Sequence, residues 1–409
     1  MTRGPAAAAV AYLWTPEAIR ERADAVLAHG LHGGLRHFAI DLARLDTAAE
    51  LVAGVTRQRY PGMAVPLHSR WRHFDAGGID RAAELERTLG HLPADERARA
   101  RIDLAVTSVL LDAGAGPDWT YRERESGMVF TRSEGLAVAS IRLFAAGFFS
   151  SERATPWRAD ARGLQAVSAA RLGAVLQVSE GNPLPGLEGR AQLLRDLGQR
   201  LLEHPDRSGP RQPRPGLLLD VARARGSGGR VAAGDLLYDV LAGLGPIWPG
   251  RLVCDGVSLG DVWAHPAAGG TGSTAGLVPL HKLSQWLTYS LIEPLADAGL
   301  TVEGIERLTG LAEYRNGGLF LDTGVLLPRH PAVVSRSHRA GDEVVVEWRA
   351  LTIALLDRLA PLVRARLGAP DLPLASILEG GTWAAGRRLA DERRRGAPPI
   401  RIASDGTVM

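Results

Sequence analysis

Residues 342–367, DEVVVEWRALTIALLDRLAPLVRARL, form the stretch that decides the fold class of this chain. The run of valines near its start is compatible with a β-strand. The stretch is much longer than a typical strand, however, and Trp348, Leu351, Leu355 and Leu359 recur at the spacing of one helix face. The pattern therefore predicts one long helix over Asp342–Leu367.

Helical patterns also dominate outward from this stretch. Thr15-Pro16-Glu17 combines an N-cap, a proline at the first helical position and an acid in the first turn. The βα alternation of a doubly wound sheet is missing, so we predict an all-α, mainly helical fold without a sheet of four or more strands. Helices are expected over residues 15–29, 42–57, 79–89, 98–113, 133–149, 160–177, 189–203 and 279–298, with a break or kink near Leu291 caused by Pro294.

One segment has the composition of a linker. Residues 205–215 concentrate Pro, Gly, Ser and Arg, and a second loose stretch ends at Gly229. We therefore expect a helical N-terminal half over 1–204, a linker-like stretch over 205–229 and a helical C-terminal half over 230–409. The halves could also form one continuous domain.

Composition excludes several classes of protein. Arg and Lys exceed Asp and Glu by 48 to 45, which leaves no large positive field for nucleic acid or a membrane surface. Cys254 is the only cysteine, which excludes an intramolecular disulfide framework. No uncharged apolar stretch of about 18 residues is present, which excludes a membrane-spanning helix. No signal peptide is recognisable at the N-terminus. We expect a soluble, cytoplasmic protein without nucleic-acid or membrane partners, and its oligomeric state stays open.

Lysine and asparagine are unusually scarce. Lys282 is the only lysine, and Asn182 and Asn316 are the only asparagines. A GC-rich genome depletes both residue types because their codons are A-rich, so these residues should survive best where no other side chain can replace them. Chance survival is the alternative, but all three lie in polar, glycine-punctuated motifs.

The first motif is YPGMAVPLHSRWRHF, residues 60–74. His68, Arg70 and Arg72 are suited to an anionic group such as phosphate, which guanidinium groups bind in a bidentate manner. The alternative is a surface turn with amphipathic packing. His68 and His73 have no carboxylate or thiol at ligand spacing, so we expect no metal here.

The second motif is SEGNPLPGLEGR, residues 179–190, which directly precedes a helix. Free amides at such a helix N-terminus attract anions, and Asn182 and Arg190 could add side-chain contacts to a substrate. The alternative is a capped connection whose glycines only serve the turn.

The C-terminal half carries the candidate catalytic groups. Asp261 lies between apolar neighbours in LGDVW, and Lys282 opens a predicted helix. In LTGLAEYRNGGLFLD, residues 308–322, an acid held near an apolar wall is typical of a general base or an electrostatic stabiliser. Residues 308–322 present Glu313, Tyr314, Arg315 and Asn316 in succession. The alternatives are a helix N-cap role for Asp261 and, in residues 308–322, a buried Glu–Arg pair that fixes a turn.

Several of these motifs resemble one family over nearly the whole chain. IDLAVTSVLLDAGAG (102–116), RSEGLAVAS (132–140), NPLPGLEGR (182–190), HKLSQWLTYSLIEPL (281–295), LTGLAEYRNGGLFLDTGVL (308–326) and the C-terminal LEGGTWAAGR and SDGTV resemble the uracil-catabolism Urc/Urg family. The resemblance implies a role in the route that converts uracil to its ribonucleotide, opens the ring and releases urea.

A second, C-terminal resemblance suggests a mechanism. HKLSQWLTYSLIEPL followed by LTGLAEYRNGGLF is similar to two motifs of the queuosine-nucleotide N-glycosylase family, which resembles the helical DNA glycosylases in fold and hydrolyses an N-glycosidic bond. Lys282 matches that family's lysine, Glu313-Tyr314-Arg315 its Asp-Tyr-Arg motif, and Asp261 matches an upstream aspartate. Glu replaces Asp, so the substrate contact of Glu313 does not transfer directly.

Together these patterns predict a hydrolase that cleaves the N-glycosidic bond of a phosphorylated ribosyl-urea or ring-opened uridine nucleotide. Glu313 and Asp261 would supply the carboxylates, and we expect neither a metal nor a redox cofactor. An amidohydrolase or ring-opening enzyme on the same route is an alternative, as is a non-catalytic nucleotide-binding partner. The predicted substrate-binding residues are Lys282, Arg315, Tyr314, Asn316, Asn182, His68, Arg70, Arg72 and Arg190.

Overall fold

The structure is a computed structural model that describes residues 5–112, 114–116, 118–203, 213–248, 252–254 and 256–403. It divides into two compact units, each built from separated stretches of the chain. Unit 1 comprises Met1–His68, Gly250–Gln285 and Gly304–Ala403, and unit 2 comprises Ser69–Pro249, Trp286–Glu303 and Ser404–Met409. The division into halves at residues 205–229 stays a prediction, and residues 205–212 of that stretch lie outside the described residues.

Unit 1 is mainly helical. Helix α13 begins here and continues in unit 2. The elements of unit 1 are α1 (Pro5–Leu13), α2 (Pro16–Leu31), β1 (Phe38–Ile40), α3 (Leu45–Arg59), β5 (Val253–Cys254), β6 (Val257–Ser258), β7 (Val262–Ala264), β8 (Leu277–Pro279), α13 (Lys282–Asp297), α14 (Tyr314–Asp322), β10 (Leu326–Pro328), α15 (Ala332–Ser335), β11 (Ser337–His338), α16 (Glu343–Leu367), α17 (Leu374–Ile377), a π-helical turn (Leu378–Thr382), α18 (Trp383–Arg394) and β12 (Arg401–Ile402).

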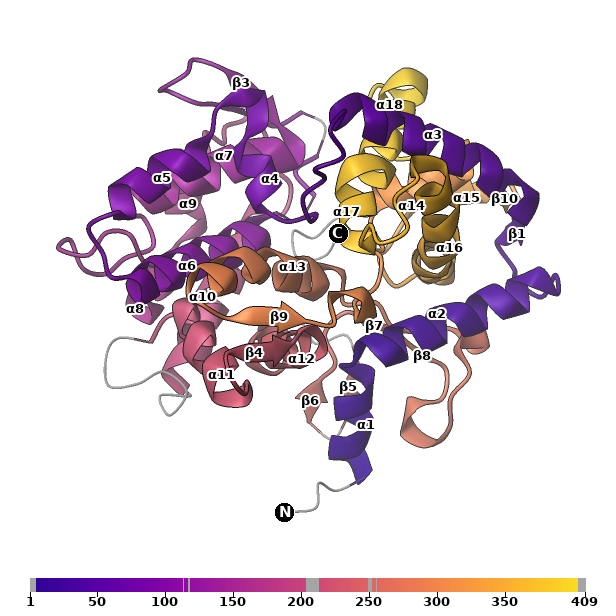
Figure 1. The fold of residues 1–409 in the computed structure, drawn as a ribbon, viewed down its shortest axis with the longest axis horizontal. Coiled ribbons are helices and arrows are strands. Elements are labelled where there is room, and N and C mark those ends of the chain that lie inside the picture. The colour runs from indigo at the N-terminus through magenta and orange to yellow at the C-terminus, as the bar shows by residue number, and fades with distance from the viewer. Residues whose placement is uncertain are drawn as a thin grey trace. The chain divides into compact units, whose positions relative to one another are not determined.

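Helix α16 is the predicted long helix, and it lies at the centre of unit 1. It packs against α2, α3 and α14 (Figure 1). Val344, Val345 and Val346 are all buried, because neighbouring elements cover the helix on more than one face near its start. The valine run is therefore a sign of burial within a helix and not of a strand.

Unit 2 is built around α6, whose second half is almost entirely buried. Helix α6 packs against α7, α10 and α11, and α10 also packs against α8 and α9. The elements of unit 2 are α4 (Trp71–Phe74), α5 (Arg81–Leu89), α6 (Ala94–Leu111), β2 (Thr120–Arg122), β3 (Val129–Thr131), α7 (Arg132–Ala145), α8 (Ala161–Gln165), α9 (Ala169–Val175), α10 (Leu187–Glu203), α11 (Leu218–Arg225), β4 (Arg230–Ala232), α12 (Ala233–Leu244), β9 (Thr301–Glu303) and the rest of α13.

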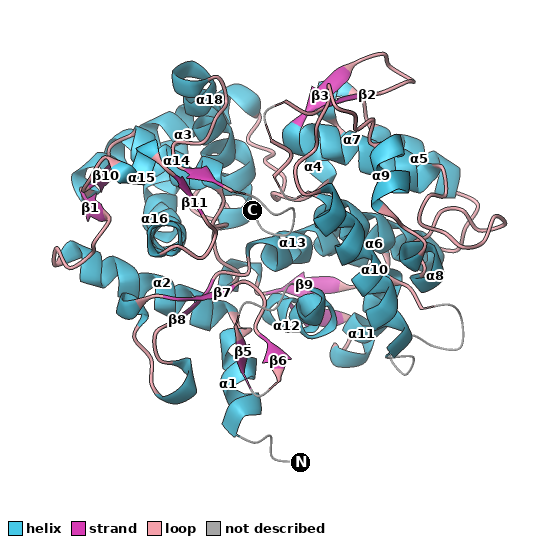
Figure 2. Ribbon diagram, turned by 180° about the vertical axis from the view of Figure 1, so that it is seen from behind, coloured by secondary structure: helices cyan, strands magenta, loops and turns pink. Residues whose placement is uncertain are grey.

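The strands are short and occur only in pairs within the described residues (Figure 2). Four pairs are antiparallel: β1–β10, β2–β3, β5–β6 and β7–β8. Two are parallel: β4–β9, in which Arg230 faces Thr301, and β11–β12. The prediction of a mainly helical fold is confirmed, because no described sheet reaches even three strands.

The expected break in α13 is wrong, since the helix continues through Pro294 to Asp297. Proline has no N–H, so it leaves the carbonyl of Ser290, four residues earlier, without its helical donor. The indole Nε1–H of Trp71 donates to that carbonyl oxygen at 2.8 Å. A tertiary contact in unit 2 thus replaces the missing bond.

No helix among the described residues combines the length and the apolar character that a membrane crossing requires. The longest described helix, α16, has 25 residues but carries acids and arginines along its length.

Two glycine-to-alanine substitutions in helices should change stability in opposite directions. Gly386 in α18 packs so closely on α14 that an added methyl group would overlap the main-chain carbonyl of Arg315. We expect Gly386→Ala to lower the free energy of unfolding by about 1–3 kcal/mol. Gly54 in α3 has open space beside it, so Gly54→Ala should raise that free energy by about 0.5–1 kcal/mol. Urea unfolding would compare the two variants, and equal stabilities would contradict the close α14–α18 packing.

Candidate functional site

The predicted site residues are distributed over both units. Unit 1 holds His68, Asp261, Lys282 and Glu313–Asn316, and unit 2 holds Arg70, Arg72, Asn182 and Arg190. Each group is described within its own unit, and a common cavity stays a prediction.

Asp261, just before β7, is a carboxylate that accepts hydrogen bonds on both of its oxygens. Arg349 of α16 donates to it in a bidentate manner, with Nη1–Oδ1 2.8 Å and Nη2–Oδ2 2.7 Å. Trp263 Nε1 donates to Oδ1 at 2.7 Å, and the main-chain N of Lys282 donates to Oδ2 at 3.0 Å. Burial alone would raise the pKa of Asp261, but Arg349 and the other donors outweigh burial and hold this pKa well below its usual range. Asp261 is therefore an anion whose oxygens are already committed to partners.

Asp261 also determines where α13 begins. Its main-chain oxygen accepts from Leu280 N at 2.9 Å and from His281 N at 3.3 Å. Its carboxylate caps the first residue of the helix, Lys282. His281 takes a φ of 44°, a left-handed conformation that is uncommon for a residue with a side chain. The only lysine is thus placed by a strained turn that one aspartate fixes.

His281 is a buried, neutral imidazole that sequence reasoning did not select. Its side chain is 1% exposed, and Nε2 donates to the carbonyl of Leu13 at 3.0 Å. Burial lowers its pKa to about 4, against the attraction of Asp261. With the proton on Nε2, Nδ1 keeps a lone pair, which has no hydrogen-bond partner among the described residues. Its place next to the only lysine was the available signal.

Glu313 is the N-cap of α14. Its Oε2 accepts from Arg315 N at 2.9 Å and its Oε1 from Asn316 N at 2.5 Å. The residue is 7% exposed. Each carboxylate oxygen can accept two hydrogen bonds, so each retains acceptor capacity beyond its amide partner. The cap fixes the position of the carboxylate and leaves each oxygen able to accept a further hydrogen bond.

Arg349 joins the two predicted carboxylate segments. Besides Asp261, it donates through Nε to the carbonyl of Ala312 at 3.3 Å, directly before Glu313. The next residue toward the N-terminus, Trp348, donates through Nε1 to Gly317 O at 3.1 Å. Helix α16 therefore holds both the Asp261 turn and the start of α14, a role that the sequence analysis did not assign to Arg349.

Aromatic rings surround Arg315. Its guanidinium lies 4.3 Å from the ring centre of Trp383 and 4.9 Å from that of Tyr314. Asn316 is fully buried, donates to Leu311 O at 3.1 Å and accepts from Thr382 Oγ1 at 2.9 Å. Asn316 thus ties α14 to the π-helical turn, while the Arg315 guanidinium makes cation–π contacts with two rings.

His68 contacts an acid that sequence reasoning missed. Its Nδ1 lies 2.8 Å from Oε2 of Glu379, in the π-helical turn. Glu379 Oε1 also accepts from Arg59 Nη2 at 2.9 Å and from the Tyr60 hydroxyl at 3.2 Å. The YPG segment is therefore tied to the LEGGTW segment, with both His68 and Glu379 buried.

In unit 2, the two arginines of the first motif form ion pairs. Arg70 is fully buried and donates to Asp112 at 2.7 Å and to Ser108 at 2.6 Å. Burial lowers the pKa of Arg70, against the attraction of Asp112. Its Nη2 has no hydrogen-bond partner in the part of the chain that is described. Arg72 pairs with Glu293 at 2.7 Å.

Asn182 and Arg190 anchor the loop between them to neighbouring main-chain groups. The Asn182 side chain accepts from Thr120 N at 2.8 Å, and it donates to the carbonyls of Thr120 at 2.9 Å and Gln177 at 2.8 Å. Arg190 donates to Leu111 O at 2.8 Å and to Gly114 O at 3.0 Å. These contacts of Asn182 and Arg190 are those of a capped connection, and their substrate contacts stay predictions.

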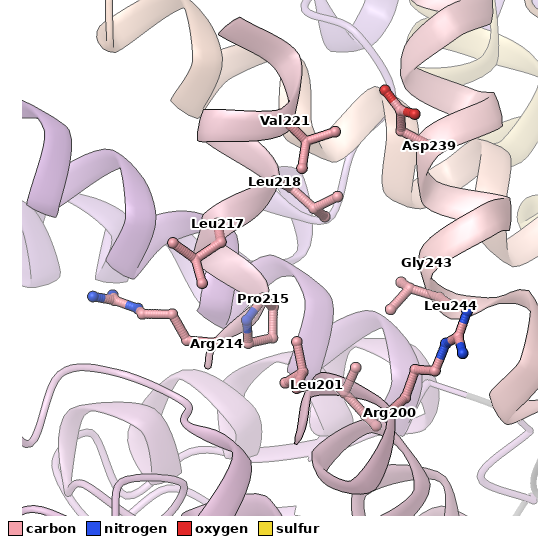
Figure 3. Close-up of a pocket in the computed structure, with 11 residues that line it drawn as sticks. Arg200, Leu201, Arg214, Pro215, Leu217, Leu218, Val221, Asp239, Gly243 and Leu244 are labelled. Atoms are coloured by element: carbon pink, nitrogen blue, oxygen red, sulfur yellow. The ribbon is translucent and has the colours of Figure 1, made fainter. Parts of the chain in front are cut away.

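A pocket lies between α10, α11 and α12 of unit 2, and Figure 3 shows its leucine-rich lining. Its polar lining residues include Asp239, which pairs with Arg225 at 2.6 Å, and Arg214, which pairs with Asp103 at 2.8 Å. None of the predicted site residues lines this pocket. Its character is apolar and does not suit a phosphorylated substrate.

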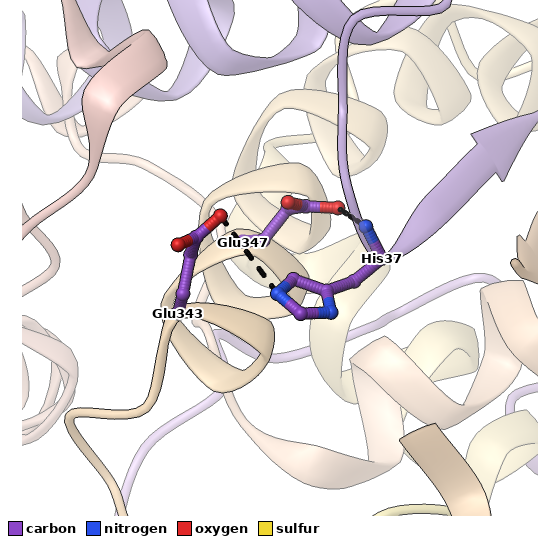
Figure 4. A group of neighbouring side chains, drawn as sticks. All are labelled: His37, Glu343 and Glu347. Atoms are coloured by element: carbon purple, nitrogen blue, oxygen red, sulfur yellow. Dashed lines mark hydrogen bonds and ion pairs between the residues drawn. The ribbon is translucent and has the colours of Figure 1, made fainter. Parts of the chain in front are cut away.

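One group of side chains in unit 1 has the composition of a metal site. His37, Glu343 and Glu347 each offer a ligand atom, and these atoms lie within 4.8 Å of one another (Figure 4). Burial lowers the pKa of His37, against the attraction of Glu347 and Glu343. The sequence analysis selected none of the three.

Comparison with known proteins identifies relatives of the whole chain. Residues 12–409 match a family described as "Protein of unknown function (DUF1688)". The chain is 38% identical over 413 residues to a Schizosaccharomyces pombe protein named "Protein urg3", and this match covers 98% of both chains. It is also 38% identical over 405 residues to a Lachancea kluyveri protein named "Uracil catabolism protein 4", covering 91% of this chain and 92% of that protein.

The buried imidazole of His281 should make stability depend on pH. Its pKa falls from 6.5 in the unfolded chain to about 4 in the fold, so the unfolded state binds more protons between these values. The stability that the fold gains by keeping His281 neutral is fully present above pH 6.5, and it is lost as the pH falls toward 4. At 1.36 kcal/mol per pKa unit, the free energy of unfolding of the wild type, relative to that of His281→Asn, should fall by about 3 kcal/mol from pH 7 to pH 4.

Urea unfolding at the two pH values measures this difference. The matched control is His91→Asn, which changes an exposed histidine. A difference for His281→Asn that is the same at both pH values would show that His281 is not held neutral by burial.

Proposed function

We infer that this chain, which belongs to the DUF1688 family of proteins of unknown function, acts in uracil catabolism. The name of the Lachancea kluyveri relative supports this role, because the two proteins are 38% identical over 91% of this chain. The Urc/Urg resemblance seen in the sequence is confirmed at the level of the family. The queuosine-glycosylase resemblance stays a prediction.

The proposed reaction is hydrolysis of the N-glycosidic bond of a ribose phosphate that carries urea or a related ring-opened pyrimidine. The bond between the anomeric carbon and nitrogen breaks, and that carbon takes the hydroxyl of water. The leaving nitrogen takes a proton, so a ribosyl-urea gives ribose phosphate and urea, and a ring-opened nucleotide gives ribose phosphate and the free ring-opened pyrimidine. Positive charge develops on the ribose in the transition state, and a fixed carboxylate can stabilise it or orient the water.

The observation that carries this assignment is the geometry of Glu313. Two main-chain amides hold its carboxylate at the start of α14, and both oxygens retain acceptor capacity. Asp261 suits a different role, because its oxygens already accept from Arg349, Trp263 and Lys282. We therefore assign Glu313 as the catalytic carboxylate and Asp261 as a positioning residue for Lys282.

Phosphate binding falls to Lys282 and Arg315 in this proposal. Lys282 stands at the start of α13, where helix amides and the positive end of the helix favour an anion. The Arg315 guanidinium lies within cation–π distance of the rings of Trp383 and Tyr314, and its fork of donors suits a phosphate. Tyr314, Asn316 and His68 would complete the contacts to the sugar and urea.

Glu313→Gln should remove the negative charge while keeping the side chain's size. We expect kcat for release of ribose phosphate and urea to fall about 10²- to 10⁴-fold, with a modest change in KM. Loss of one cap hydrogen bond should also lower stability by about 1 kcal/mol. The assay supplies phosphorylated ribosyl-urea and measures both products, which should form in a one-to-one ratio.

The matched control is Asp160→Asn, since Asp160 is a buried N-cap of α8 whose oxygens accept from Gly163 N and Ser151 N. It should lose comparable stability and keep its activity. Wild-type turnover by Glu313→Gln would falsify the catalytic assignment. Hydrolysis that leaves the ribose–nitrogen bond intact, with neither free urea nor ribose phosphate, would indicate an amidohydrolase, and binding without any turnover would indicate a nucleotide-binding partner.

Lys282→Ala should weaken substrate binding more than it slows turnover. The cap from Asp261 reaches the main-chain N of Lys282, so alanine keeps the helix start intact. Loss of one charge-assisted contact to phosphate should raise KM about 10- to 100-fold, with a smaller fall in kcat. Steady-state kinetics measure both quantities. An unchanged KM combined with a large fall in kcat would place Lys282 at the reacting bond instead.

A further inference from the structure

The first two turns of α16 present two acids toward a histidine from the N-terminal part of the chain. Glu343 and Glu347 are four residues apart, so they lie on one face of the helix. His37 directly precedes β1, and all three side chains point toward one another in Figure 4. All three belong to unit 1.

Two buried atoms in this cluster have polar chemistry that the described residues do not satisfy. Glu347 is fully buried, and its Oε1 accepts from His37 N at 3.1 Å and from Phe38 N at 3.0 Å. Its Oε2 has no hydrogen-bond partner within the described ranges, and the same holds for His37 Nε2. A buried polar atom without a partner costs about 1–3 kcal/mol, so a bound species that contacted both atoms would be stabilised at this place.

The surroundings of His37 suit metal ligation. Its Nδ1 lies 3.1 Å from Nε2 of His330, and a proton on Nδ1 leaves the lone pair of Nε2 for a metal. His37 Nε2 is 3.8 Å from Glu343 Oε1, too far for a hydrogen bond. Two ligands that each stand about 2.0–2.2 Å from one ion in tetrahedral geometry are about 3.3–3.6 Å apart, so a small closure of the two side chains would let both reach one ion.

His265 stands behind the cluster as a supporting group. Its Nδ1 accepts from Ala267 N at 3.2 Å, which leaves the proton of the neutral ring on Nε2. That Nε2 lies 3.5 Å from Glu347 Oε2. His265 is therefore placed to orient the carboxylate, as outer-sphere donors do around metal ligands.

We propose that His37, Glu343 and Glu347 bind one divalent transition-metal ion, with His330 and His265 orienting the ligands. One imidazole and two carboxylates suit Mn²⁺, Fe²⁺ or Zn²⁺, and three protein ligands leave positions for water or substrate. Exposed Arg36, 3.3 Å from the other oxygen of Glu343, balances part of the charge. This inference goes beyond the proposed function and does not depend on it.

Metal titration of the purified full chain tests the site directly. After treatment with a chelator, the protein should bind one Zn²⁺ or Mn²⁺ per chain, measured by calorimetry for Zn²⁺ and by electron paramagnetic resonance for Mn²⁺. Because binding joins segments distant in the chain, Tm should rise by about 5 °C at a hundredfold excess over Kd. Mg²⁺, which prefers oxygen ligands alone, should bind more weakly.

Single substitutions should locate the ion. His37→Gln and Glu347→Gln should each weaken binding by at least about 100-fold, because losing a direct ligand should exceed the 10- to 100-fold effect of an outer-sphere group. Glu343→Gln changes a side chain that is 30% exposed, so it should weaken binding without unfolding the chain. His32→Gln and Glu306→Gln, at exposed positions of unit 1, should leave affinity unchanged.

Two outcomes would overturn the proposal. One is the absence of saturable binding of Zn²⁺ and Mn²⁺ by the wild-type chain. The other is binding that Glu343→Gln, folded by circular dichroism, leaves at wild-type affinity, since the ion would then lie elsewhere.

Discussion

The bidentate ion pair between Arg349 and Asp261 is the interaction on which the candidate site depends. It joins the middle of the buried helix α16 to the turn before β7, and Asp261 in turn caps α13 at Lys282. A buried pair of this kind contributes little net stability, but removing one partner leaves an uncompensated charge that costs about 3–5 kcal/mol. Its main effect is to specify one arrangement of the surrounding segments.

Three consecutive residues of α16 hold other segments of unit 1 in place through hydrogen bonds. Glu347 accepts from the amides of His37 and Phe38, Trp348 donates to Gly317, and Arg349 reaches Asp261. Successive helix positions point in different directions, so one helix reaches three distant parts of unit 1. The proposed metal site and the proposed hydrolytic site therefore share one helix as their scaffold.

Family membership and site geometry support the proposed function in different ways. The relatives support the proposed pathway, because one of them is named for uracil catabolism and the match covers 91% of this chain. The structure supplies a division of labour between two acids that look alike in sequence. Glu313 is held by amides and keeps free acceptor capacity, whereas Asp261 is enclosed by donors. Only the first arrangement suits a carboxylate that faces a reacting ribose.

The sequence by itself determined the helical class and the position of most helices, because burial repeats locally at 3.6 residues per turn. It also indicated the family and the polar motifs around Lys282 and Glu313. Only the tertiary structure decided that α13 continues through Pro294, since the donor from Trp71 is remote in sequence. The partners of Asp261 and the His37–Glu343–Glu347 cluster likewise needed the fold. Their members lie far apart along the chain, and a local pattern carries no signal for contacts made only by packing.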